Sequence, residues 1–194
     1  MVLTPSTMLP LNTLLPGFDL PMPNGLRFKS SALDERPVVL MVICAHCPFV
    51  KHIEPELSRL EQDYGDRIQL IGVSSNSLIT HPQDGPEQLL AQAERHGWRF
   101  PYLMDQEQTL AKALRAACTP EFYLFAMRAS EGHALQYRGQ LDSSRPGNQQ
   151  PLNGQDLRRA LDAVLAGQPV EAEQIASVGC NLKWHPGQEP DWFR

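Results

Sequence analysis

Two cysteines separated by two residues carry the clearest chemistry in this sequence: Cys44 and Cys47 enclose Ala45-His46. A thiolate attacks a disulfide and a second thiol releases the mixed disulfide, so this spacing is typical of thiol–disulfide exchange. We expect Cys44 at or just before a helix N-terminus, where unpaired amides and the helix dipole favour negative charge. His46 can add a hydrogen bond or a positive charge, and both effects lower a thiol pKa. Cys47 would be the buried, resolving thiol.

Two apolar patterns on either side of these cysteines position them. Residues 38–43 form a continuous apolar run, typical of a strand buried on both faces. Residues 47–64 have helical apolar spacing, with Pro48 suited to the first turn and Gly65 to the end. The pattern therefore places the cysteines at the carboxyl end of a buried strand, where the sites of such sheets lie.

The rest of the chain alternates between strand and helix patterns. The expected strands are residues 68–73, 100–104, 121–127 and 134–138, with a turn at 129–132, and the expected helices are residues 87–96, 107–117 and 156–166. Asn24-Gly25 between short alternating segments predicts an N-terminal hairpin. Together these patterns predict an α/β fold with a central mixed sheet and helices on both faces. We expect an N-terminal extension (1–16), one domain (17–167) and a C-terminal tail packed on it (168–194).

Composition excludes several classes of function. The chain has 194 residues and a net charge of −5, with 42% hydrophobic and 20% charged residues, which suits one globular domain. There is no basic stripe that would indicate nucleic-acid binding, and the longest apolar run, residues 38–45, is too short to cross a bilayer. The first residues do not resemble a secretory signal, so we expect a cytoplasmic protein, in which cysteine pairs are catalytic, redox-sensing or metal-binding.

A second motif, Cys118-Thr119-Pro120, stands directly before the strand expected at 121–127. Together with Cys44-Ala45-His46-Cys47, it resembles the thioredoxin superfamily, and most closely the redoxin branch that includes the AhpC/TSA group. The resemblance covers about residues 15–167 and includes residues 100–105 and 137–139. It implies a thioredoxin-like fold in which Cys44 is the nucleophile, Cys47 resolves and Pro120 is cis. Thr119 would then offer its backbone to an extended substrate segment.

The activity that this resemblance implies is thiol–disulfide oxidoreduction through a Cys44–Cys47 dithiol, without a cofactor. Its partners would be protein or small-molecule disulfides and a thiol electron donor such as a thioredoxin-type system. We expect neither nucleic acid nor membrane as a partner, and a monomer or a weak homodimer.

Two alternatives stay open. The first is a peroxiredoxin-like thiol peroxidase with an antioxidant role. Peroxiredoxins carry Thr or Ser three residues before the peroxidatic cysteine, a place that Met41 occupies relative to Cys44. The second is a redox-sensing, thioredoxin-like binding module, which the proline-rich N-terminus and the tail with Trp184 and Trp192 motivate.

The other two cysteines, Cys118 and Cys180, stand alone and far apart. A zinc site would need a second Cys/His pair downstream of Cys47, so no metal is expected. Cys118 lies two residues before Pro120 and should be near the site, either as a buried thiol or as a bonded one. We hypothesise that the tail folds back and that Cys180 pairs with Cys118, as a structural clip or a second redox step.

Overall fold

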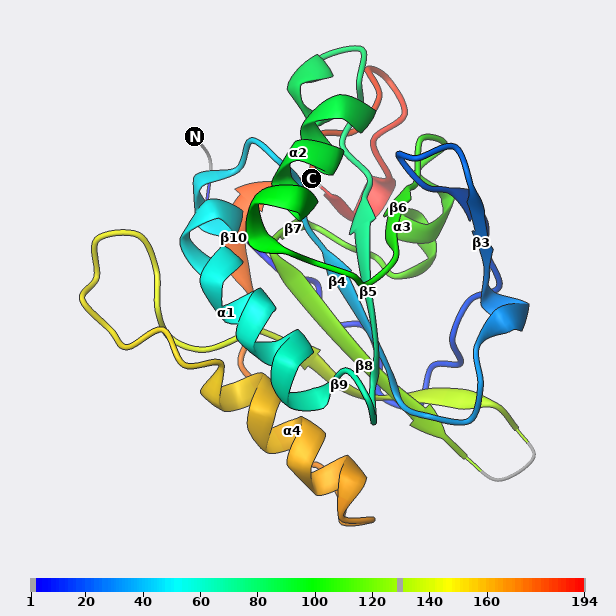
Figure 1. The fold of residues 1–194 in the computed structure, drawn as a ribbon, viewed down its shortest axis with the longest axis vertical. Helices are drawn as coiled ribbons and strands as arrows, with labels where there is room; N and C mark the ends of the chain where they lie inside the picture. The colour runs from blue at the N-terminus through cyan, green and yellow to red at the C-terminus, as the bar shows by residue number, and fades with distance from the viewer. Residues whose placement is uncertain (1–2, 129–130, 194) are drawn as a thin grey trace.

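The structure is a computed structural model that describes residues 3–128 and 131–193, so Ala129 and Ser130 of the expected turn lie outside the described residues. Its central sheet has five strands in the order β6-β5-β4-β8-β9 (Figure 1). These strands are β4 (Val38–Val42), β5 (Gln69–Ser74), β6 (Tyr102–Met104), β8 (Glu121–Met127) and β9 (His133–Gly139). The N-terminal hairpin that Asn24-Gly25 predicted is formed by β2 (Asp19–Pro21) and β3 (Arg27–Lys29).

Strand β4 is the middle of the central sheet, and all five of its residues are buried. It runs parallel to β5 and antiparallel to β8, so the sheet is mixed, as predicted. Side chains alternate along a strand. Val39 and Met41 therefore lie in one apolar core, and Val38, Leu40 and Val42 lie in the core on the other face.

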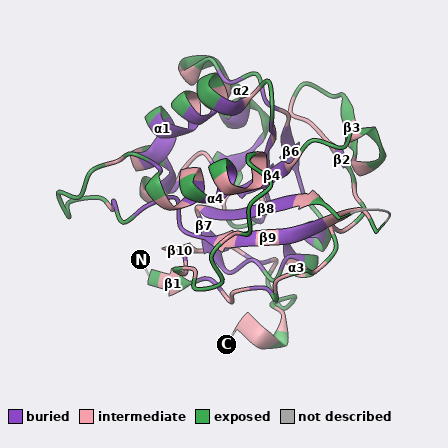
Figure 2. Cartoon of the chain, turned by 90° about the horizontal axis from the view of Figure 1, so that it is seen from below, coloured by how far each residue is buried: buried purple, intermediate pink, exposed green. Residues whose placement is uncertain are grey.

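Helices cover both faces of this sheet, as predicted. They are α1 (Pro48–Tyr64), α2 (Pro86–His96), α3 (Thr109–Ala113) and α4 (Gln155–Leu165). Buried residues of α1, α2 and α4 belong to the core with Val39, whereas α3 packs in the opposite core (Figure 2). Helix α3 is shorter than expected because Arg115 has a φ of 51°, which is outside the helical region.

A three-stranded sheet built from distant parts of the chain was not expected. Its order is β1-β10-β7, with bounds Leu3–Pro5, Val178–Asn181 and Cys118–Thr119, all antiparallel. Strand β10 belongs to the segment predicted to be a C-terminal tail packed on the domain (168–194). Figure 1 shows it beside the N-terminal end of α1. Its sequence, Val-Gly-Cys-Asn, has no apolar alternation, which explains why local patterns did not reveal it.

No helix in the described part of the chain combines the length and the apolar character needed to span a membrane. The division into an extension, a domain and a tail stays a prediction, although β1 and β10 join the first and last of these segments in one sheet.

Candidate active site around Cys44 and Cys47

The two cysteines lie in the connection between β4 and α1, at the carboxyl end of the central strand. Helix α1 begins at Pro48, and Cys47 is its N-cap residue. Proline suits the first helical position because its φ is already helical and its missing N–H has no partner to lose there. The helix thus begins one residue later than predicted. Cys47, rather than Cys44, is the cysteine at the helix N-terminus.

Both sulfurs converge on Thr119, from a strand 72 and 75 residues further along the chain. The Cys44 Sγ lies 3.8 Å from the Thr119 Oγ1, and the Cys47 Sγ lies 3.4 Å from the Thr119 carbonyl oxygen. The Thr119–Pro120 peptide bond is cis. The structure therefore brings together Cys44, Cys47, Thr119 and Pro120, the residues of the two motifs. Both cysteine side chains are fully buried.

The environments of the two sulfurs shift their pKa values in opposite directions. Burial raises the pKa of the Cys44 thiol, and its hydrogen bond to Cys47 and the charge of Asp84 act in the same direction. Hydrogen bonding with the Cys180 and Cys44 thiols lowers the pKa of Cys47 despite its burial. The helix N-terminus at Cys47 also favours a negative charge there. The sequence led us to expect a lowered pKa at Cys44, whereas burial, the hydrogen bond to Cys47 and the charge of Asp84 raise it in this structure.

Asp84 holds the dipeptide between the cysteines. Its Oδ1 accepts hydrogen bonds from the Ala45 and His46 amides at 2.9 and 3.0 Å. Its Oδ2 lies 2.6 Å from the His46 Nδ1 and accepts from the Asn76 Nδ2 at 2.9 Å. Burial opposes ionisation of Asp84, but the hydrogen bonds from His46 and Asn76 outweigh it, so its pKa is lowered. The carboxylate therefore fixes the backbone between the two sulfurs.

Sequence reasoning missed Asp84, which lies in the polar connection after β5. Strands β4 and β5 are parallel neighbours, so their carboxyl ends meet at one edge of the sheet. The rule that sites gather at that edge applies to this connection as a whole, so it is the signal that could have found the residue. It did not distinguish Asp84 from the other polar residues there, because which of them turns inward depends on the folded loop.

The Cys44 Sγ, the His46 Nδ1 and an Asp84 oxygen lie within 4.8 Å of one another, which is close enough to hold a metal ion. However, the two Asp84 oxygens already take part in four hydrogen bonds. A carboxylate has about four lone-pair positions, so a cation would have to displace one of these partners. These donors form a satisfied hydrogen-bond cluster and do not fit a metal centre.

The remaining cysteines do not contact each other as hypothesised. The Cys180 Sγ lies 2.8 Å from the Cys47 Sγ, whereas the Cys118 Sγ lies 3.9 Å from both the Pro120 carbonyl oxygen and the Glu121 Oε2. In the β10–β7 register, Cys180 is opposite Thr119 rather than Cys118. Neighbouring residues of a strand point to opposite faces, which directs the Cys118 side chain away from Cys180. The structure thus brings Cys180 to Cys47 instead.

The strand edge that was expected to receive an extended substrate is already occupied. Residues Cys118 and Thr119 form β7, which pairs with the protein's own β10. The pairing continues beyond the strand, since the Leu182 amide donates to the Ala117 carbonyl at 2.9 Å. The expectation of an open Thr119 backbone is therefore wrong for this structure, because a segment from the C-terminal region takes that place.

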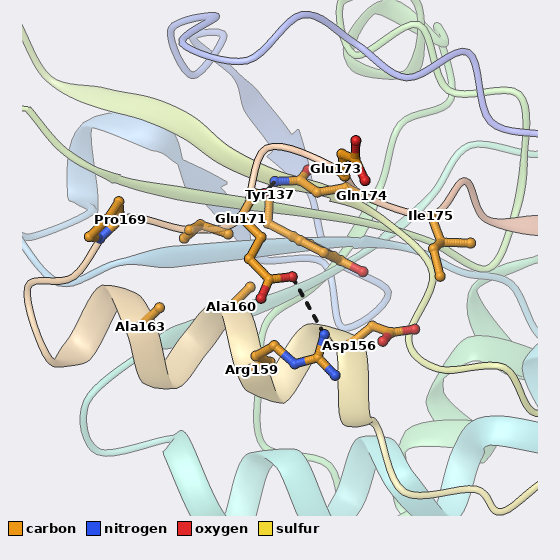
Figure 3. Close-up of a pocket in the computed structure, with 11 residues that line it drawn as sticks. Tyr137, Asp156, Arg159, Ala160, Ala163, Pro169, Glu171, Glu173, Gln174 and Ile175 are labelled. Carbon is orange, nitrogen blue, oxygen red and sulfur yellow. Dashed lines mark hydrogen bonds and ion pairs between the residues drawn. The ribbon is translucent and has the colours of Figure 1, made fainter.

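A separate pocket of about 160 Å³ lies between α4 and the segment that follows it (Figure 3). Arg159 of α4 and Glu171 of the following segment form an ion pair of 3.6 Å across it, and Tyr137 of β9 lies behind them. No cysteine lines this pocket in the described part of the chain. It therefore takes no part in the thiol chemistry.

The fold and the comparisons with known proteins agree. The structure is a thioredoxin-like α/β fold, and solved structures that resemble it include a secreted Mycobacterium tuberculosis disulfide oxidoreductase homologous to E. coli DsbE. That match has a TM-score of 0.58 at 15% identity, over 75% of this chain and 95% of the other. The peroxidoxin BcpB from M. tuberculosis matches with a TM-score of 0.59 at 17% identity, over 80% of this chain and 96% of the other.

The AhpC/TSA family model matches residues 11–138, and the chain belongs to this family. An uncharacterized conserved protein from Geobacillus kaustophilus is 42% identical over 96% of this chain and 98% of its own, with a TM-score of 0.90. A hypothetical protein from Sinorhizobium meliloti 1021 is 38% identical over 95% of this chain and 100% of its own, with a TM-score of 0.89. No curated protein sequence matches the chain.

Proposed function

We propose that this protein is a thiol–disulfide oxidoreductase that uses Cys44 and Cys47 as its redox-active dithiol. The observation that carries the proposal is the convergence of both sulfurs on Thr119, at 3.8 and 3.4 Å. Family membership and the disulfide oxidoreductase among the similar folds support redox chemistry at this place. The Asp84 carboxylate keeps the backbone between the two sulfurs in one geometry, as an exchange site requires.

We infer that Cys47 is the attacking group, because its pKa is lowered whereas that of Cys44 is raised. The two cysteines thus have the opposite roles to those that the sequence predicted. The Cys47 thiolate attacks one sulfur of a substrate disulfide, whose S–S bond breaks and whose other half leaves as a thiolate. The Cys44 proton passes to that leaving thiolate. The Cys44 sulfur then attacks the Cys47 Sγ and releases the second half. The substrate gains two electrons and the protein holds a Cys44–Cys47 disulfide.

The partners that suit this chemistry are disulfides and a thiol electron donor, such as a thioredoxin-type system, that returns the disulfide to the dithiol. Cys44 and Cys47 are fully buried, whereas Ala45 and His46 between them are half-buried. A substrate therefore reaches the sulfurs only after a local opening of this loop or of β10. A small disulfide needs a smaller opening than a protein segment does.

The first prediction tests the exchange itself. Reduction of a small aromatic disulfide and of insulin, each with dithiothreitol as donor, should fall at least about tenfold in Cys47→Ser, because the attacking sulfur is lost. Cys118→Ser serves as the matched control, since its thiol lies against Pro120 and Glu121 and takes no part in the step. Equal rates for wild type and Cys47→Ser would disprove the proposal.

A thiol peroxidase is the second candidate, and one contact favours it. The hydroxyl that the sequence lacks at Met41 is supplied in space by Thr119, whose Oγ1 lies 3.8 Å from the Cys44 Sγ. In this reaction the Cys44 thiolate attacks a peroxide, becomes a sulfenate and releases an alcohol or water. Thr119→Val should then reduce peroxide consumption at least about tenfold while leaving reduction of the small disulfide within about twofold. The same loss in both assays would contradict this candidate.

The binding-module alternative loses one observation that motivated it. Trp184 is buried in the core, and the rings of Trp192 and Phe193 pack edge-on against it at 5.7 and 5.6 Å. Trp184 is therefore part of the core, whereas Trp192 and Phe193 pack on it and stay half-buried.

A further inference from the structure

Cys180, a residue that the dithiol reaction does not use, lies in direct contact with the sulfur of Cys47. The Cys180 Sγ lies 2.8 Å from the Cys47 Sγ, across 133 residues of sequence. Both side chains are buried, with Cys180 only 3% exposed. Two thiols in direct contact differ from a disulfide only by two electrons and two protons, so this contact places a second partner on the proposed attacking sulfur.

The position of Cys180 is set by pairing on both sides of its strand. Strand β10 lies between β1 and β7, with Cys180 opposite Leu3 on one side and Thr119 on the other. Gly179 permits the close approach, because a Cβ at this position would lie 2.1 Å from the Thr119 carbonyl oxygen. After the strand, the Lys183 amide donates to the Asn76 Oδ1 at 2.8 Å. Cys180 is thus held by a built sheet rather than by a loose tail.

The space beside Pro120 leaves little room next to strand β10. A cavity of only about 20 Å³ lies there, lined by residues that include Phe49, Pro120 and Val178. That volume is close to what one water molecule needs. An extended peptide segment cannot enter it, and the main-chain groups of Thr119 that such a segment would pair with are opposite Cys180.

We propose that Cys180 is a third redox cysteine, which the protein's own C-terminal strand holds against Cys47 in the place of a substrate cysteine, and that Cys47 and Cys180 form a disulfide. The inference rests on the proposed exchange chemistry of Cys47. It adds a second resolving thiol that competes with Cys44.

The step balances in the same way as the one that uses Cys44. After Cys47 has attacked a substrate disulfide, one half of the substrate is bonded to the Cys47 Sγ. The Cys180 sulfur attacks the Cys47 Sγ, a Cys47–Cys180 bond forms, and the bond to the substrate half breaks. The Cys180 proton passes to that departing thiolate. The substrate disulfide has gained two electrons, the protein has lost two, and Cys44 is still a thiol.

Tryptic peptide mapping can identify which sulfurs are joined. Cys44 and Cys47 fall in one peptide, residues 30–51, because the Arg36–Pro37 bond resists trypsin. Cys180 falls in residues 160–183, and Cys118 in residues 116–128. The full-length protein is oxidised with diamide, a two-electron thiol oxidant, then quenched in acid, alkylated and digested without reduction. Wild type, Cys44→Ser and Cys118→Ser are compared, and the last is the matched control.

We expect the linked peptide 30–51 with 160–183 in all three proteins. In Cys44→Ser the only cysteine of the first peptide is Cys47, so the link identifies the Cys47–Cys180 bond. Its yield in that variant should be at least twofold higher than in wild type, because the competing thiol is absent.

Three results would overturn the inference, and they differ in what they leave standing. A disulfide confined to peptide 30–51 in wild type, with Cys180 alkylated in wild type and in Cys44→Ser, leaves the Cys44–Cys47 function intact. A link between peptides 116–128 and 160–183 shows instead that Cys180 pairs with Cys118. Complete alkylation of all four cysteines after oxidation removes both this inference and the proposed dithiol function.

Discussion

Cys47 is the residue on which the proposed thiol chemistry depends. It is the N-cap of α1, its sulfur lies 3.4 Å from the Thr119 carbonyl oxygen, and hydrogen bonding with Cys180 and Cys44 lowers its pKa. The pKa values of Cys44 and Cys180 are raised, the first chiefly by burial and the second chiefly by its hydrogen bond to Cys47. We therefore expect Cys47 to ionise first among these three thiols.

This order can be measured through the thiolate absorbance near 240 nm. At neutral pH, Cys44→Ser should keep the thiolate band, and Cys47→Ser should lose it. In Cys180→Ser the midpoint of the band should move to higher pH, because the largest contribution that lowers the pKa of Cys47 is removed. A band that disappears in Cys44→Ser and persists in Cys47→Ser would assign the thiolate to the other cysteine.

The raised pKa of a second titratable residue, Glu121, leads us to expect that stability depends on pH. Burial raises its pKa from 4.5 to about 7, although its Oε2 accepts hydrogen bonds from the Ala117 and Cys118 amides at 2.9 and 3.3 Å. Between these pH values the folded state binds the proton and the unfolded state does not. The free energy of unfolding should therefore fall as pH rises through this window, by up to about 3 kcal/mol at about 1.4 kcal/mol per pKa unit.

Glu121→Gln isolates this contribution, because a glutamine keeps an acceptor for the two amides and does not titrate. Urea unfolding at pH 4.5 and pH 8 gives the free energy of unfolding of both proteins. Relative to wild type, the variant should be more stable at pH 8 than at pH 4.5. A difference that is the same at both pH values would contradict the assignment to Glu121.

At the scale of elements, the site is made by strand β10 as much as by the β4–α1 connection. Strand β10 pairs with β7 so closely that a Cβ at residue 179 would lie 2.1 Å from the Thr119 carbonyl oxygen. The glycine is therefore what allows Cys180 to reach Cys47. On the other side of the cysteines, Asp84 fixes the loop by accepting hydrogen bonds from the amides of Ala45 and His46.

Gly179→Ala should force β10 away from β7 and destabilise the protein by about 1–3 kcal/mol, the usual range for overpacking. It should also reduce the yield of the Cys47–Cys180 linked peptide after oxidation. Gly17→Ala is the matched control, because the nearest atom to its Cβ would be the Ser30 Oγ at 3.9 Å, an ordinary contact distance. Urea unfolding of both variants checks the first effect, and wild-type stability in Gly179→Ala would contradict it.

At the scale of the whole molecule, the two ends of the chain close the site together. Leu9 from the N-terminal region and Leu182 and Trp184 from the C-terminal region pack in the same core as α3. Strands β1 and β10 pair on the same side of the molecule. The stability of the region that carries Cys180 therefore depends on a core shared by distant parts of the chain.

Trp184→Ala should lower the free energy of unfolding by about 3–5 kcal/mol, as is usual for removal of a buried tryptophan. It should also make Cys180 react faster with a maleimide in the folded protein, because the strand before it loses its anchor. Trp192→Ala, at a half-buried position, should cost less. Equal losses in urea unfolding for the two variants would show that Trp184 is not the anchor of this core.

Much of the fold is readable from local pattern. The run at 38–43 predicted β4, and the spacing at 47–64 predicted α1, because burial on two faces or on one stripe leaves a period in the sequence. The strands and helices of the central sheet follow the same rule, with boundaries that differ by a few residues. The two motifs of the site were also visible, since Cys44, Cys47, Thr119 and Pro120 are recognised by type and spacing.

The acidity of Cys47 could not be predicted from the sequence. Its spacing from Cys44 indicated exchange chemistry, but its pKa depends on a helix that begins at Pro48 and on a thiol 133 residues away. The β10–β7 pairing, the closed Thr119 edge and the Asp84 contacts are likewise long-range. Strand pairing between distant segments is decided by which edges remain unpaired after the rest has folded, and a four-residue strand leaves no periodic trace of it. The chain by itself determined which groups can react, and only the tertiary structure decided which sulfur faces which.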